Sequence, residues 1–236
     1  MNSIIAKLKK IKMRLTGEAS HLKVTRCVKK EWVGNQYGGF YVASDFIGPA
    51  SVVYSFGIGR DVSFDLGLIQ KFGCQVHGFD PTPASVQWVG LQHLPAEFHF
   101  YEYGLARDTG TTLFYLPLNP EHVSGSMVTQ SNVNSNINVE VEMKSLQDVM
   151  AMLHHDKIDV LKMDIEGAEY DVLNAMLDQK IYPGQLLIEF HDRLMPKGHD
   201  CSRKDVFRLQ QVRYQMFAVS DSMQEVSFVY NAPGTN

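Results

Sequence analysis

The stretch Ser51–Arg60 constrains the fold more than any other part of this chain. Its apolar, β-favouring residues lead directly into Gly57 and Gly59, which predicts a buried strand that ends in a tight glycine turn. Apolar residues at helical spacing follow the turn: Phe64, Leu66, Leu68, Ile69 and Phe72. A strand, a glycine turn and a helix start in this order are typical of a pocket for the polar part of a nucleotide-like ligand. Glycines in βα turns also serve geometry alone, so the turn by itself leaves both interpretations open.

Length and composition favour one large soluble domain. The chain has 236 residues, of which 44% are hydrophobic and 20% charged, and such a chain can bury a sizeable core. No apolar run approaches the roughly 18–20 residues that span a bilayer, and we expect no secretory signal. Cys27, Cys74 and Cys201 are far apart and lack C-x-x-C spacing, which indicates neither a disulfide framework nor a zinc site. These features predict a reduced, cytoplasmic setting.

Positive charge gathers at the N-terminus. Residues 1–30 hold nine Lys or Arg against one acid, whereas the rest of the chain is acidic and the whole carries a net charge of −4. The acidic remainder argues against nucleic acid as the main partner. Residues 4–15 place Ile4, Leu8, Ile11 and Leu15 on one face of a helix. We favour a helix that packs on the domain, and peripheral contact with an anionic membrane is the alternative.

The chain divides into an N-terminal segment, 1–45, and a main domain, 46–236. The N-terminal segment joins the basic helix to a stretch rich in glycine and aromatic residues, including Trp32, Tyr37 and Tyr41. We expect this stretch to cover the mouth of a site. It forms either a hydrophobic lid over one edge of the sheet or a surface that touches the ligand.

Strands and helices alternate along the main domain, which predicts an α/β fold with a mostly parallel sheet covered on both faces. Strands are expected at 51–56, 74–80, 98–106, 111–116, 137–143, 158–165, 185–191, 214–220 and 226–230, and helices after Arg60 and at 84–94, 145–154, 168–177 and 203–212. Ligands of such sheets bind beyond the carboxyl ends of the strands, near the point where the strand order reverses.

Acidic side chains stand at several of these strand ends. Asp80 lies about 20 residues beyond the glycine turn, where a carboxylate can accept both hydroxyls of a ribose. Asp164 and Glu166 follow an apolar strand, and His191 and Asp192 follow the next one. Acids also favour helix N-termini and a single histidine is commonly structural, so a structural role for these residues stays open. Their shared sheet edge nevertheless makes them candidates for catalysis.

Three motifs resemble those of the FkbM-type S-adenosylmethionine-dependent methyltransferases. They are Phe56-Gly-Ile-Gly59, Phe79-Asp-Pro81 and the more specific Leu161-Lys-Met-Asp-Ile-Glu-Gly-Ala-Glu169. The segment Val139–Leu146 is also similar to a strand and helix entry of that family. The resemblance runs from about Ser51 to Asp192, and neither residues 1–45 nor the C-terminal strands carry a signature of the family.

The resemblance implies a Rossmann-like methyltransferase fold, with a seven-stranded sheet whose last strand is antiparallel. It also implies methyl transfer from S-adenosylmethionine, most often to a hydroxyl of a sugar or small metabolite, so a small-molecule or glycan acceptor is expected. Carried over to this chain, the residues expected to bind the cofactor are Ser55, Phe56, Gly57, Gly59, Asp61, Asp80, Leu105 and Asp164. One position departs from the family, which has an acid where this chain has Ser55. Asp61 or Asp65 could take over its contact with the cofactor's amino group.

Methyl transfer to a hydroxyl needs positioning and a base within hydrogen-bond reach. The hypothesis is that Asp164 or His191 accepts the proton, while Glu166 or Asp192 orients the base or binds the acceptor. A divalent cation on Asp164, Glu166 and His191 is a lesser possibility, because no ligand spacing requires it, and the working expectation is no metal.

Two other functions stay open. An NAD-dependent oxidoreductase also uses a ribose-binding acid, but the turn Gly57-Ile-Gly59 lacks the third glycine of that fingerprint. A non-catalytic cofactor-binding or interaction module is the second alternative, suggested by Ser55.

Overall fold

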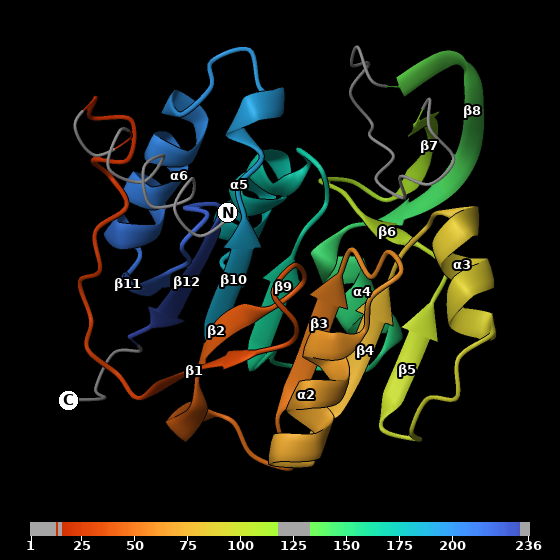
Figure 1. Cartoon of the computed structure of the whole chain (residues 1–236), viewed down its shortest axis with the longest axis horizontal. Coiled ribbons are helices and arrows are strands. Elements are labelled where there is room, and N and C mark those ends of the chain that lie inside the picture. Colours follow the sequence, from red (N-terminus) through yellow and green to blue (C-terminus); the bar gives the residue numbers. More distant parts are fainter. Residues whose placement is uncertain (1–12, 14–15, 118–132, 232–236) are drawn as a thin grey trace.

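A central sheet organises the molecule, seen in a computed structural model that describes Met13 and residues 16–117 and 133–231 (Figure 1). Within these residues the sheet has seven strands in the order β11-β12-β10-β9-β3-β4-β5. Their bounds are β3 Val52–Phe56, β4 Gln75–Phe79, β5 Phe98–Tyr101, β9 Val160–Met163, β10 Gln185–Glu189, β11 Tyr214–Val219 and β12 Glu225–Tyr230. The last strand, β12, runs antiparallel to both of its neighbours, and β5, β4, β3, β9 and β10 pair in parallel. The predicted Rossmann-like α/β fold is confirmed.

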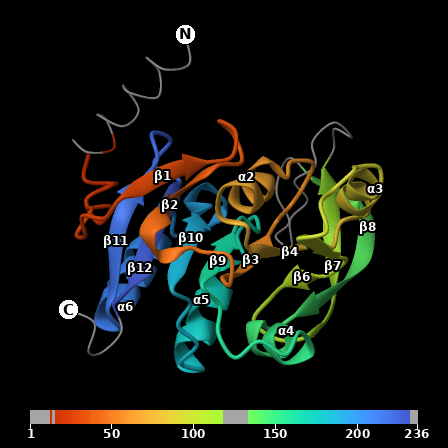
Figure 2. The ribbon, with the colours of Figure 1, turned by 90° about the horizontal axis from the view of Figure 1, so that it is seen from below.

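Helices cover both faces of this sheet (Figures 1 and 2). One face carries α4 (Leu146–Met152), α5 (Glu169–Asp178) and α6 (Asp200–Gln211). The other carries α2 (Ser63–Phe72), α3 (Pro83–Gly90) and a hairpin of β1 (Lys30–Val33) and β2 (Phe40–Ala43). Alternate strand residues feed two separate cores, so that Tyr54 packs with the first set of helices and Val53 with the second. Burial on both faces explains why the strands are continuous apolar runs rather than alternating ones.

The strand-to-helix connection after β3 follows from local sequence. Asp65 stands in the first turn of α2, where an acid suits the helix dipole. The helix ends at Gly73, which adopts a left-handed conformation with φ of 66° and donates its N–H to the Ile69 carbonyl. The acid in the first turn and the glycine at the end thus set the two ends of α2, which follows the glycine turn closely.

A second, three-stranded sheet lies beyond the carboxyl ends of β4 and β5. It consists of β6 (Gly104–Leu105), β8 (Val133–Lys144) and β7 (Gly110–Pro117). The prediction of one strand over 98–106 is wrong, because the chain leaves the central sheet after Tyr101 and pairs with β8 instead. Gly104 packs so closely on Met143 and Pro81 that a side chain there would collide with both. The helix predicted at 84–94 also ends earlier, at Gly90.

The β1–β2 hairpin is part of the core of the main domain. Phe40, Val42 and Ala43 are buried in the same cluster as α2 and the sheet. The Gln185 side chain on β10 accepts a hydrogen bond from the Ala43 N–H at 2.8 Å and donates to the Ala43 carbonyl at 3.2 Å. The basic helix predicted at 4–15 lies outside the described residues, apart from Met13. Among the helices that the structure describes, none has the length and apolar character to cross a membrane.

Candidate active site

A pocket opens where the carboxyl ends of β3, β4 and β9 meet, which is the point where the strand order reverses. The pocket is open to solvent on one side and combines polar with apolar walls, as ligand sites commonly do. Its lining residues are Gly38, Phe56, Gly57, Ile58, Gly59, Asp61, Phe64, Asp65, Phe79, Asp80, Pro81, Thr82, Gly104, Leu105, Phe114, Met143, Lys162, Asp164, Ile165, Glu166 and Ala168. The position agrees with the general rule for ligands of open α/β sheets.

The glycine turn forms one wall of the pocket and requires glycine at its first position. Gly57 has φ of 84°, and a Cβ atom there would overlap the carbonyl oxygen of Asp164. The Gly57 N–H donates to the Phe79 carbonyl at 3.0 Å. Gly57 therefore lets the ends of β3 and β9 touch. Gly59 also has a positive φ, 57°, but a Cβ there would meet open space.

Asp80 closes the pocket at the end of β4 and is almost fully buried. One carboxylate oxygen accepts the Gly59 N–H at 2.8 Å, and the other accepts the Thr82 N–H at 2.9 Å and its hydroxyl at 2.6 Å. A carboxylate offers about four acceptor positions, so capacity for a ligand hydroxyl remains. These bonds also fix the orientation of the carboxylate before a ligand binds.

Apolar side chains of the smaller sheet form the opposite end of the pocket. Leu105 on β6, Phe114 on β7 and Met143 on β8 are all buried and line it, beside the stacked rings of Phe56 and Phe79, whose centroids lie 4.2 Å apart. Sequence reasoning missed Phe114 and Met143 as site residues. Both residues lie in segments expected to be strands, at 111–116 and 137–143, and nothing in those segments indicates that they reach the pocket.

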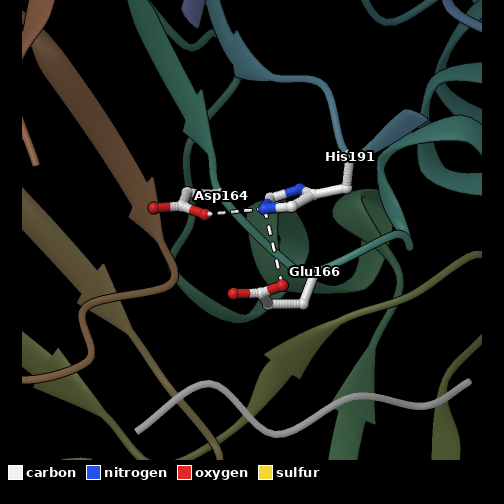
Figure 3. Close-up of side chains that lie close together, drawn as sticks. All are labelled: Asp164, Glu166 and His191. Atoms are coloured by element: carbon white, nitrogen blue, oxygen red, sulfur yellow. Dashed lines mark ion pairs between the residues drawn. The ribbon is translucent and has the colours of Figure 1, made fainter. Parts of the chain in front are cut away.

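His191 and four carboxylates gather beside the pocket, and Figure 3 shows two of these carboxylates pointing at the imidazole. The His191 Nε2 atom lies 3.7 Å from Asp164, 3.5 Å from Glu166 and 3.7 Å from Glu189. Its other ring nitrogen, Nδ1, lies 2.8 Å from the fully buried carboxylate of Glu169. Glu169 thus holds the imidazole at Nδ1, and Nε2 is directed at Asp164, Glu166 and Glu189.

This arrangement changes the protonation of its members. Burial alone would lower the pKa of His191, but the hydrogen bond and charge of Glu169, with the charges of Glu166 and Asp164, outweigh it and raise that pKa to about 9. Burial, with the charge of Asp164, raises the pKa of Glu189 to about 8. His191 is therefore an imidazolium at neutral pH.

The structure brings most of the predicted residues to the pocket, but not all. Asp61, Asp80, Asp164 and Glu166 line it, as do Phe56, Gly57, Gly59 and Leu105. His191 is only 1% exposed and lies behind Asp164 and Glu166. Ser55 is fully buried and is not among the lining residues.

Asp192 points into a different network. Its carboxylate accepts hydrogen bonds from the Tyr170 hydroxyl at 2.9 Å and the Ser202 hydroxyl at 2.6 Å, and lies 2.8 Å from His199 Nδ1. These contacts join η2 (Asp192–Leu194) to α5 and α6. The side chain is thus occupied within the fold.

Asp164, Glu166 and His191 also form a set that could hold a metal ion. Each offers one ligand atom, and these atoms lie within 4.8 Å of one another. Two carboxylates and one imidazole suit a divalent cation. An ion at this position would replace the proton of His191 Nε2.

A seven-stranded sheet of this order, with one antiparallel strand and a ligand pocket at its switch point, defines the class of Rossmann-like methyltransferases. Residues 52–225 match the model of the methyltransferase FkbM domain. The chain therefore belongs to the FkbM methyltransferase family, which confirms the resemblance of its motifs.

Individual relatives cover this chain only in part. The human protein described as probable methyltransferase-like protein 24 is 29% identical over 142 residues, which cover 59% of this chain and 32% of that protein. Its rat counterpart is 28% identical over the same shares. The chain thus spans about a third of the length of these relatives. Among solved structures, the methyltransferase FkbM of Methylobacillus flagellatus KT matches with a TM-score of 0.50 and 14% identity, over 78% of this chain and 44% of that one, which shows the fold alone.

Proposed function

We propose that this chain is an S-adenosylmethionine-dependent methyltransferase that methylates a hydroxyl oxygen of a small molecule or glycan. The observation that carries the proposal is the convergence of Asp80, the glycine turn and the carboxylates of Asp164 and Glu166 on one pocket. Family membership supports the reaction class, and the carboxylates support a hydroxyl acceptor because such an acceptor needs a base.

The residues of the pocket fit this cofactor. Gly57 and Gly59 bring the backbone to the pocket wall, and Asp80 is positioned for a ribose hydroxyl at the polar end of an apolar cavity. Leu105, Phe114 and Met143 offer an apolar surface for a purine ring. When bound, the cofactor supplies a methyl group on a sulfonium, and the protein's task is to orient the acceptor oxygen in line with it.

Asp164 is the proposed base. Its carboxylate is about a quarter exposed and faces the pocket, so it can take the hydroxyl proton as the new C–O bond forms and the S–CH₃ bond breaks. His191 is a positioning residue in this proposal, because its protonated ring holds Asp164 and Glu166 from behind. Glu166, on the pocket wall, is proposed to bind the acceptor.

The test is a screen of hydroxyl-bearing acceptors with isotopically labelled S-adenosylmethionine, read by mass spectrometry of the products. We expect a product that gains one methyl group on oxygen. A parallel titration with S-adenosylhomocysteine and NAD separates the alternatives. Binding of NAD alone would indicate an oxidoreductase, and binding of neither would indicate a non-catalytic module.

A further inference from the structure

Three polar side chains are buried within an apolar layer at one end of the pocket. Ser55 on β3 and Lys162 on β9 are register partners in adjacent parallel strands, so both point to the face that α2 covers. Asp65 reaches the same place from the first turn of α2. Asp65 is 1% exposed and Lys162 is 4% exposed. The ring of Phe40 packs beside them, with its centroid 5.7 Å from the Lys162 ammonium.

The hydrogen bonds of this group are incomplete. Lys162 Nζ donates to the Gly57 carbonyl at 3.0 Å, and within the described residues it has no ion-pair partner. Asp65 Oδ1 and Ser55 Oγ are buried without a hydrogen-bond partner in the described part of the chain. The Ser55 hydroxyl favours the charged form of the Asp65 carboxylate, although the two do not reach hydrogen-bond geometry. Buried polar atoms without partners are costly, and Asp65, unlike Ser55, lines the pocket, where a ligand could supply the missing partner.

Charge strengthens this conclusion. Burial raises the pKa of Asp65, and the Lys162 ammonium opposes that shift without forming an ion pair with the carboxylate. A ligand that carries both a positive and a negative group would supply a charged partner to the Asp65 carboxylate and to the Lys162 ammonium at the same time. Both side chains line the pocket beside Gly57, at the end away from Phe114 and Met143.

We propose that Asp65 and Lys162 form a clamp for the amino-acid end of the cofactor. Asp65 accepts hydrogen bonds from the α-ammonium group, and Lys162 donates to the α-carboxylate. Ser55, whose hydroxyl favours the charged form of the Asp65 carboxylate, is small enough to leave room for it. The inference rests on the proposed function, because it assumes a cofactor with an amino-acid end.

The clamp is tested by calorimetric titration of the full chain with three ligands. S-Adenosylhomocysteine carries both charged groups, its decarboxylated analogue keeps only the ammonium, and methylthioadenosine lacks both. We expect Asp65→Asn to weaken S-adenosylhomocysteine and the decarboxylated analogue roughly tenfold or more. Lys162→Met should weaken S-adenosylhomocysteine alone. Neither variant should change the affinity for methylthioadenosine by more than about twofold.

Matched controls keep the result interpretable. Lys71→Met removes a lysine of α2 that pairs with Glu31 away from the pocket, and it should leave all three affinities unchanged. Equal losses for all three ligands, or no loss for S-adenosylhomocysteine, would overturn the clamp. If a variant does not fold, the unmodified protein still tests the clamp. The clamp requires this protein to bind S-adenosylhomocysteine more tightly than the decarboxylated analogue or methylthioadenosine. Binding of no ligand by the unmodified protein would instead contradict the proposed function itself.

Discussion

Asp164 is the residue on which the proposed chemistry depends. It follows β9 directly, its N–H donates to the Phe56 carbonyl at 3.1 Å, and its carbonyl oxygen lies against Gly57. Its backbone is thus held on both sides while its carboxylate faces the pocket. Glu166, two residues on, has a positive φ of 51° and begins the turn that leads into α5. A rigid backbone beneath a pocket carboxylate is the arrangement that a general base requires.

Replacing Asp164 with asparagine should lower kcat by roughly 100-fold or more, because the amide keeps the shape but accepts no proton. Steady-state kinetics on the acceptor found by the screen would measure the change. Asp171→Asn provides the control, since Asp171 is an exposed carboxylate of α5 outside the candidate pocket. A variant that lost only affinity for S-adenosylhomocysteine would place Asp164 in cofactor binding instead.

The sequence predicted some site residues and missed others for a physical reason. Asp80 and Asp164 end apolar strands, and an acid at the end of a buried strand is a local signal. Lys162 lies within the strand motif, and its burial beside Asp65 depends on how α2 packs over β9. Glu169 likewise looked like a helix N-terminal acid until the fold placed it against His191. Contacts between elements set these roles, and no spacing along the chain encodes them.

At the scale of elements, the contact between the glycine turn and the end of β9 gives a second prediction. Gly57→Ala should destabilise the fold by roughly 3 kcal/mol or more, because the new methyl group overlaps a backbone oxygen. Gly59→Ala also has a positive φ but meets open space, so it should cost only about 1 kcal/mol. Chemical denaturation of both variants measures the difference. Equal losses would show that the two strand ends can move apart.

The stretch that forms the β1–β2 hairpin was expected to cover the mouth of the site, as a hydrophobic lid or as a surface that touches the ligand. Gly38, between the two strands, lines the pocket, whereas β2 is buried in the core. Phe40→Ala should cost roughly 3–5 kcal/mol, because Phe40 is 1% exposed and packs edge-on against Phe64. Tyr37→Ala, in the same hairpin but 82% exposed, should change stability by less than about 0.5 kcal/mol. Thermal denaturation of the two variants measures both changes in stability. A neutral Phe40→Ala would show that the hairpin detaches without cost to the core.

The strands of the central sheet could be predicted because each is an apolar run between turn residues. The break between β5 and β6 could not, because Phe98–Ala106 is β-favouring almost throughout and Glu102 and Tyr103 carry no turn signal. After the break Gly104 pairs with Met143 on β8, a residue about 40 positions away in the chain, and no local signal encodes such a partner.

At the scale of the whole molecule, the buried charges predict how stability depends on pH. The folded-state pKa of His191, about 9, lies above its ordinary value of 6.5, so its contribution is complete below pH 6.5 and is lost as pH rises through 9. The folded-state pKa of Glu189, about 8, also lies above its ordinary value of 4.5. Loss of its proton therefore also lowers the stability of the fold as pH rises. We therefore expect the Tm to fall as pH rises from about 7 to 9.

His191→Asn tests this prediction. An asparagine amide can still bond Glu169 but carries no titrating group, so the pH dependence of unfolding between pH 7 and 9 should decrease by up to one proton. Denaturant titrations across this range measure it. An unchanged slope would mean that His191 is not the group that titrates, and Lys71→Met serves as a variant that should retain the full slope.

The attachment of the N-terminal segment to the C-terminal strands has a consequence for biosynthesis. The N–H groups of Thr25 and Arg26 both donate to the Met216 carbonyl on β11, and Ala43 is bonded by Gln185 on β10. A ribosome delivers the first of these partners long before the second. The backbone groups of Thr25, Arg26 and Ala43 must therefore remain without these partners until β10 and β11 have emerged. Residues 25–43 are made long before the strands that secure them, and nascent chains halted before residue 185 should expose them to chaperones and proteases.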